Sequence, residues 1–414
     1  MDDLAGFLQI ATWPPEPGVA FWAALALVGG ALLGELVRRA FGMPRIVGYS
    51  AVGLVLGLAG FGAGMLQGNA RLIVDLALAL LLFELGSRVN LRWLRANPAL
   101  LLTGAVEALA SFAAIYGALR VIGQPVNVAL TCATLGTSAS GAVVARVAGE
   151  LKAAGQVTER VIVLTSLSTL FAVLAHKLVI GWLHLDVAGD WVRAVSLPLW
   201  AFGGSVLVAA LLAALVAWIA RRLDLRDENA ALLLLGLVVL ALMAAKLLNL
   251  STLLVPLLAG VLLRNTRERP WVWPRHFGTA GGVLVLMMFV IVGSAGSVDA
   301  VLAGGAAALV LLVVRAAAKT TAVFVLAPWS GIHWRQALGL SLALTPLSGT
   351  ALVLLSDLQG THPAFAPLVA PVILSAIVFT EVLGPLAVQW GLRLAGEQHP
   401  EPSTEARRVE TVVA

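Results

Sequence analysis

The sequence predicts an all-α polytopic membrane protein with about thirteen transmembrane helices, arranged as two inverted repeats of six helices with two discontinuous helices. Three observations support this fold class. The 414-residue chain is 60% hydrophobic and only 12% charged, whereas a soluble domain carries about 25% charged residues. Its basic residues fall almost entirely in alternate loops. Finally, one T-x-x-S-G pattern occurs twice, at 137–141 and 345–349, each time inside an apolar stretch.

A spanning helix needs roughly 20 mostly apolar residues, and thirteen stretches of about that length occur along the chain. The third and ninth stretches are short, so we expect these helices to tilt little or to be extended by flanking residues. In order, the stretches are 19–37, 45–66, 72–87, 98–122, 126–148 and 158–183, then a linking helix at 196–220, then 229–248, 251–264, 277–297, 299–326, 335–356 and 364–394. We therefore expect a transmembrane transporter domain over 1–397 and a short polar cytoplasmic tail over 398–414.

The basic residues indicate how these helices are oriented. With the N-terminus outside, twenty of the 27 Lys and Arg residues fall in inside loops and the tail, three fall outside, and four lie within helices. This bias follows the positive-inside rule and predicts an N-out, C-in chain. The formal charge of +5 is then loop charge, so the partner we expect is the lipid bilayer and not a nucleic acid. The acidic first eighteen residues predict no cleavable signal, and the single Cys132 excludes an internal disulfide.

The two T-x-x-S-G segments lie in the fifth and twelfth stretches, seven helices apart, so they cross the membrane in opposite directions. Inverted repeats with matching interruptions are typical of secondary transporters. Pro346 removes one helical hydrogen bond and obstructs another, so a break is expected there. Such breaks expose backbone carbonyls that can hold an ion. The alternative is that these small residues serve only close helix packing.

Ionisable residues inside the membrane cost roughly 2.5–3.5 kcal/mol each, which makes them functional candidates. Arg315 and Lys319 lie four residues apart on one helix face. Arg315 is expected to neutralise the C-terminal dipoles of the two interrupted helices, whereas Lys319 either shares that role or exchanges a proton. The other intramembrane candidates, several of which lie close enough to span ends to pair or snorkel there, are Glu35, Asp75, Glu84, Glu107, His176, Lys177, Lys246 and Glu381.

Four segments resemble Kef-type cation:proton antiporters of the sodium/proton exchanger superfamily. They read MPRIVGYSAVGLVLG (43–57), LALLLFELGSRVNLRWLR (78–95), the Arg-x-x-x-Lys helix with the interrupted helix after it (315–355), and TEVLGPLAVQWGLRLAGE (380–397). The resemblance implies a homodimer in the cytoplasmic (inner) membrane, with a scaffold domain and a mobile core whose interrupted helices cross. It also implies exchange of protons for sodium or potassium ions.

One departure from this family concerns the sixth helix, where typical members carry an essential aspartate that binds cation and proton in competition. The corresponding stretch, RVIVLTSLSTLFAVLAHKLV (160–179), has no carboxylate. Hydroxyls can coordinate a cation but do not titrate near neutral pH. The expected cation ligands are therefore Thr137, Ser138, Ser140, Ser168, Thr169, Thr345 and Ser348, and the expected charge-compensating or proton-handling residues are Lys319, Arg315, Glu84 and Glu381.

Three functions remain open at this point. The protons could be handled away from the sixth helix, by Lys319, Glu84 or Glu381. The chain could instead be a cation or solute pathway without proton coupling, or a transport-degenerate member with a structural or regulatory role. No hydrolase, kinase or metal-ligand spacing occurs, so we expect no enzyme, no catalytic residues, no cofactor and no metal beyond the transported monovalent cation.

Overall fold

The computed structural model describes residues 19–61, 69–222, 228–266, 277–296, 298–347 and 349–398. Every regular element in these ranges is helical, which confirms the all-α prediction. Nearly all of the predicted polar tail lies outside the described residues.

The thirteen predicted stretches all reappear as helices, and the two that contain T-x-x-S-G are each split in two. The first half consists of α1 (Val19–Phe41), α2 (Arg45–Leu56) with the π-helical turn η1 (Gly57–Phe61), α4 (Asn69–Arg88), α5 (Leu91–Ala96), α6 (Pro98–Val121), α7 (Val126–Thr137), α8 (Gly141–Glu150) and α9 (Gln156–Ala188). The linking helix is α10 (Trp191–Arg222). The second half consists of α11 (Glu228–Leu247), α12 (Leu254–Thr266), α13 (Phe277–Ser294), α14 (Val298–Ser330), α15 (Trp334–Ala343), α16 (Gly349–Thr361) and α17 (Ala366–Leu394).

Seven helical segments of the described chain are long and apolar enough to cross a membrane, and four further apolar helices are shorter. Two differences from the predicted bounds have local causes. The short α5 was not predicted; it begins because the Asn90 side chain accepts hydrogen bonds from the backbone N–H groups of Arg92 and Trp93. The linking helix begins five residues earlier than predicted, because the Asp190 side chain accepts hydrogen bonds from the backbone N–H groups of Val192 and Arg193, and it then passes through Pro198.

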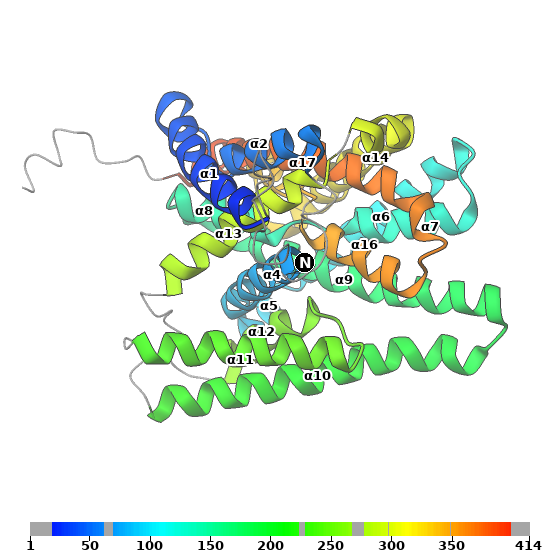
Figure 1. The fold of residues 1–414 in the computed structure, drawn as a ribbon, viewed down its shortest axis with the longest axis horizontal. Helices are drawn as coiled ribbons and strands as arrows, with labels where there is room; N and C mark the ends of the chain where they lie inside the picture. The colour runs from blue at the N-terminus through cyan, green and yellow to red at the C-terminus, as the bar shows by residue number, and fades with distance from the viewer. Residues whose placement is uncertain are drawn as a thin grey trace, which may run out of the picture.

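The long helices run roughly side by side, with α10 and α11 along one edge of the molecule (Figure 1). The connections α6–α7, α9–α10 and α16–α17 all lie at the right-hand end of this view. The charge bias of the loops predicts that these three connections face outside, and we call this end the outer end. Helix α14 lies against α6 and α17, and α15 also packs on α17.

A glycine pair sets the distance between α15 and α17. A Cβ on Gly339 would lie 2.4 Å from the carbonyl oxygen of Gly391, and a Cβ on Gly391 would lie 2.3 Å from that of Gly339. The two backbones therefore touch, as small residues permit in membrane helix pairs. Eleven residues before Gly391 on α17, the Thr380 hydroxyl donates to the carbonyl of Leu347. Helix α17 thus holds the interrupted α15–α16 pair in place.

Glu397 ties the end of the described chain to the start of α9. Its buried carboxylate accepts hydrogen bonds from the backbone N–H groups of Val157 (2.6 Å) and Thr158 (2.7 Å), and from the Thr158 hydroxyl (2.7 Å). These N–H groups have no partner within the helix.

Replacement of Glu397 by alanine is therefore expected to lower the free energy of unfolding by about 1–3 kcal/mol, because buried donors lose their acceptor. Thermal unfolding of the purified protein in detergent measures this loss. The matched control is Glu159→Ala, at an exposed glutamate in the first turn of the same helix, which we expect to cost less than about 0.5 kcal/mol. Equal losses in the two variants would contradict the capping role.

Candidate functional site

The two T-x-x-S-G segments meet inside the protein. Helix α7 ends at Thr137 and α8 begins at Gly141, and the Ser140 side chain caps α8 by accepting from the backbone N–H of Val143. The Ser140 backbone N–H donates to the carbonyl of Pro346 at 2.9 Å, so the unwound segments of both interrupted helices lie in contact. The paired interruptions are therefore a helix crossing, as the fold prediction required.

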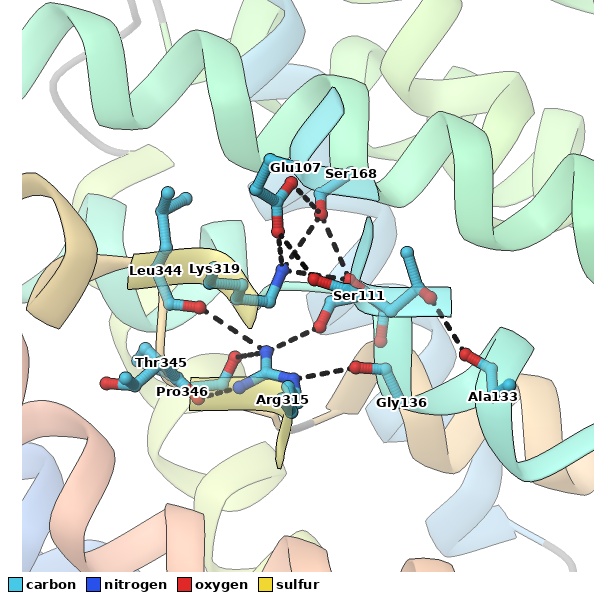
Figure 2. Close-up of polar contacts among 12 residues, drawn as sticks. Glu107, Ser111, Ala133, Gly136, Ser168, Arg315, Lys319, Leu344, Thr345 and Pro346 are labelled. Carbon is cyan, nitrogen blue, oxygen red and sulfur yellow. Dashed lines mark hydrogen bonds and ion pairs between the residues drawn. The ribbon is translucent and has the colours of Figure 1, made fainter. Parts of the chain in front are cut away.

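Arg315 of α14 joins the carbonyl ends of both interrupted helices (Figure 2). Its side chain is fully buried, and its guanidinium donates to five carbonyl oxygens, those of Gly136, Ser138, Leu344, Thr345 and Pro346. Its Nε donates to the Gly136 carbonyl at 2.6 Å. Helix C-termini present carbonyls without intrahelical partners and carry partial negative charge. These contacts support the proposed compensating role of Arg315.

Lys319 lies one turn further along α14 and forms an ion pair with Glu107 of α6. Neither side chain has any exposed surface. The Lys319 ammonium also donates to the Thr137 carbonyl at 3.1 Å and to the Ser168 hydroxyl at 3.4 Å. The ammonium is thus surrounded by three kinds of oxygen, from α6, α7 and α9.

The carboxylate of Glu107 is held by hydroxyls as well as by the ammonium. The Ser168 Oγ lies 3.3 Å from Glu107 Oε2, and the Ser111 Oγ lies 3.4 Å from Oε1. Figure 2 shows Glu107, Ser168 and Lys319 converging on one point. The site therefore contains a carboxylate at the crossing, but it comes from the fourth span and not from the sixth.

The sequence predicts Glu107 to be an intramembrane charge, but it was not predicted as a residue of the exchange site. A signal for it is present in the sequence. Thr103, Glu107 and Ser111 follow one another at intervals of four residues in an otherwise apolar helix, and all three are buried. A polar stripe of this period predicts one face turned toward a polar partner. Moreover, α6 and α14 are the fourth and eleventh spans, which the inverted repeat relates to each other.

Three of the hydroxyls predicted as cation ligands form hydrogen bonds within their own helical turn instead. The hydroxyls of Thr137, Ser138 and Thr345 donate to carbonyls three or four residues earlier, at 2.8, 2.8 and 2.5 Å. It is their carbonyl oxygens that face Arg315 and Lys319. Among the predicted hydroxyl ligands that the structure describes, only Ser168 contacts the ion pair through its side chain.

The remaining predicted residues lie in different places. Thr169 is fully buried and its hydroxyl has no hydrogen-bond partner. Glu84 lies in the last turn of α4, where it is one-third exposed and pairs with Arg88 at 2.8 Å. Glu381 is buried on α17 and accepts from the Ser50 hydroxyl of α2 at 3.0 Å. Ser348 lies outside the described residues.

The family profile described as "Sodium/hydrogen exchanger, transmembrane" matches residues 23–394, which is most of the chain. The chain belongs to the sodium/hydrogen exchanger family. Comparison with curated proteins found no match for this exchanger.

Two solved structures share the fold of this exchanger. Both show the sodium proton antiporter MjNhaP1 from Methanocaldococcus jannaschii. The structure at pH 8 has a TM-score of 0.63 and 17% sequence identity, and covers 90% of this chain and 94% of its own. The electron microscopy map gives a TM-score of 0.69 and 16% identity, and covers 92% of this chain and 98% of its own. At this identity the likeness establishes the fold.

A charged cavity opens at the outer end of the exchanger. It has a volume of about 380 Å³ and is lined by side chains from α4, α9, α16 and the α11–α12 connection. Two ion pairs form its walls, Lys177–Asp357 at 2.8 Å and Lys246–Asp75. Asp357 was not predicted as a functional residue, because the predicted span ended one residue before it.

Histidines lie near this cavity. His176 of α9 is fully buried and lies 3.2 Å from Asp357 through Nε2. In the α16–α17 connection, partial burial lowers the pKa of His362, and the neighbouring imidazoles of His184 and His176 lower it further. His362 is therefore mostly neutral at pH 7. The described residues contain no group of three or more His, Cys, Asp or Glu side chains arranged to hold a metal ion.

Proposed function

We propose that this exchanger is a Kef-type antiporter that exchanges a monovalent cation, sodium or potassium, for protons across the cytoplasmic membrane by alternating access. The observation that carries the proposal is the buried Glu107–Lys319 pair beside the opened carbonyl end of α7. In the proposed arrangement the N-terminus is outside and the C-terminus is cytoplasmic, and two copies form a homodimer in which a core moves against a scaffold. Family membership supports cation:proton exchange.

The oxygens around Lys319 form a suitable cage for a monovalent cation. The ammonium is bonded to a Glu107 carboxylate oxygen, the Thr137 carbonyl and the Ser168 hydroxyl. Carboxylate, carbonyl and hydroxyl oxygens are also the ligands that hard cations prefer, and unwound helix ends supply such carbonyls in transporters. The ammonium therefore occupies the position that a transported cation would take. Cation and ammonium compete for one set of oxygens.

Charge balance converts this competition into exchange. A net charge buried in a dry interior is costly, so the site favours states of equal charge. With Lys319 protonated, its charge neutralises Glu107. When a monovalent cation binds Glu107, the same balance is kept only if the Lys319 ammonium releases one proton to the solvent on the open side. The neutral amine that remains then leaves the cage. One cation is then exchanged for one proton, and Arg315 keeps its carbonyl partners throughout.

The account predicts electroneutral exchange. In proteoliposomes with a clamped membrane potential, a change of 100 mV is expected to alter the rate of sodium-driven proton movement by less than about twofold. A cycle that moved one net charge would gain or lose about 2.3 kcal/mol per 100 mV, which corresponds to a shift of about 50-fold in the gradient that it can sustain. Such a dependence would contradict the one-for-one cycle.

The function itself is tested with purified protein in liposomes that carry a pH gradient. Added sodium or potassium chloride is expected to dissipate the gradient, whereas choline chloride is not. An uncoupled pathway would show cation flux under voltage without proton movement. A transport-degenerate member would show neither flux. Either result would contradict the proposed exchange.

A further inference from the structure

Five buried polar atoms without hydrogen-bond partners lie on α9 and α16. Two of them, Nε of Arg160 and Nε2 of His184, lie near the two ends of α9. The other three lie between those ends or on α16, and they are the hydroxyl of Thr169, the hydroxyl of Thr350 and Nδ1 of His176. The exposed fractions of these side chains are 0%, 1% and 0%. Leaving a buried polar group unpaired costs free energy, and each case calls for an explanation, such as a ligand that binds there. Within the described residues, Thr169 and Thr350 are the only hydroxyls in this condition.

The two threonines lie at matching depth on neighbouring helices. Helix α17 runs from the end of α16 to a point just before Glu397, which caps the start of α9. The end of α16 and the start of α9 therefore lie at opposite ends of α17, so α9 and α16 run in the same direction. The helices contact each other, and His176 bonds to Asp357. Thr169 precedes His176 by seven residues, and Thr350 precedes Asp357 by seven residues. Seven residues are nearly two full turns, so both threonines lie on the same facing sides about 10 Å deeper.

The line of polar groups connects the outer cavity with the proposed exchange site. At its outer end, the one-third exposed carboxylate of Asp357 lines the cavity together with Lys177. At its inner end, Thr169 is followed toward the protein centre by Ser168, whose hydroxyl contacts Glu107 and Lys319. His176, Thr169 and Thr350 lie between these two ends.

We propose that the hydroxyl oxygens of Thr169 and Thr350 are transient ligands for the monovalent cation on its way between Asp357 and the Glu107 site. This inference rests on the proposed function, because it assumes that such a cation is transported. Hydroxyl oxygens have free lone pairs for a cation, and a cation in passage would supply the partner that both side chains lack. The outer cavity would admit the hydrated ion, and the carboxylate of Asp357 would attract it.

Threonine-to-valine variants test this route. Thr169→Val and Thr350→Val keep the side-chain shape and remove only the oxygen, whereas Thr169→Ser and Thr350→Ser keep the oxygen. In right-side-out vesicles, sodium chloride and potassium chloride are supplied separately and proton movement is followed. We expect each valine variant to raise the KM for the active cation about tenfold, and each serine variant to stay within about twofold of wild type.

The matched control is Thr131→Val on α7. The Thr131 hydroxyl is also fully buried, but it donates to the carbonyl of Asn127 at 2.8 Å. This variant is expected to keep the wild-type KM. If a valine variant fails to fold, the serine variant at the same position and a Thr→Ala variant at the other threonine supply the comparison.

The outcomes separate the route from the proposed function. If the valine variants keep the wild-type KM while Glu107→Gln abolishes exchange, the route is wrong and the exchange site stands. If they change only the pH dependence and not the KM, protons and not cations use these hydroxyls, which also overturns the route. If wild type shows no exchange at all, the proposed function fails. The route is then tested by the thermal stabilisation that sodium or potassium chloride gives over choline chloride: loss of this stabilisation in the valine variants supports the route, and its retention overturns it.

Discussion

Replacement of Glu107 by glutamine is expected to reduce cation-coupled proton exchange at least about 100-fold. Glutamine has the same shape as glutamate but carries no charge, so it neither attracts a cation nor neutralises Lys319. Removing one partner of a buried ion pair costs roughly 3–5 kcal/mol because the other charge stays buried and unpaired. Proton movement in proteoliposomes measures the loss of exchange, and thermal unfolding measures the loss of stability.

A double variant separates the two effects. Glu107→Gln combined with Lys319→Met removes both buried charges, so we expect thermal stability to return to within about 1 kcal/mol of wild type while exchange stays absent. Glu159→Gln, at an exposed carboxylate of α9, is the control for a neutral substitution. Exchange at more than half the wild-type rate in the double variant would contradict the role of this pair.

Loss of the Arg315 side chain has the second-largest expected effect, and it concerns folding. Arg315→Met removes the guanidinium donor from five carbonyl oxygens of the crossing, of which that of Pro346 keeps the Ser140 N–H as a donor. We expect a loss of about 3–5 kcal/mol in the free energy of unfolding, visible as a lower melting temperature and faster limited proteolysis. Arg315→Lys is expected to recover only part of it, because an ammonium has three donors and lacks the planar fork of a guanidinium.

Arg335→Met is the matched control, since Arg335 lies in the first turn of α15 against the ring of Trp334 and is exposed. It is expected to change the free energy of unfolding by less than about 0.5 kcal/mol. If Arg315→Met unfolds like wild type and only exchange is altered, Arg315 acts on the transported ions and not on the helix ends.

Much of the architecture was predictable because it depends on local features of the sequence. The length of each apolar stretch predicts a span, and the distribution of Lys and Arg predicts the direction in which that span crosses the membrane. The T-x-x-S-G segments indicate where two of the spans break. Pro346 marks the second break directly. These features were sufficient to predict all thirteen helices and both interruptions.

The source of the carboxylate was not predicted, for a physical reason. The Glu107–Lys319 pair depends on contact between α6 and α14, which are more than 200 residues apart in the chain. The family resemblance implies a carboxylate in the sixth span, but the polar groups at the expected position are the hydroxyls of Thr165, Ser166, Ser168 and Thr169. The buried stripe that Glu107 forms with Thr103 and Ser111 is the local feature that indicates it.

The role of the crossing residues also depends on geometry that sequence does not specify. Buried Ser and Thr side chains in helices tend to donate to the carbonyl one turn earlier, and Thr137, Ser138 and Thr345 do so. Their backbone carbonyls are then the groups available to Arg315 and Lys319. Which way an unwound carbonyl points is decided by the packing of the crossing and not by the identity of its residue.

The most direct test of the account is proton release on cation binding. Purified protein in weakly buffered detergent solution is titrated with sodium chloride and, separately, potassium chloride, and bound cation and released protons are both counted. The account predicts about one proton released per cation bound in wild type, and neither binding nor release in Glu107→Gln. Cation binding without proton release in wild type, or unchanged release in Glu107→Gln, would contradict it.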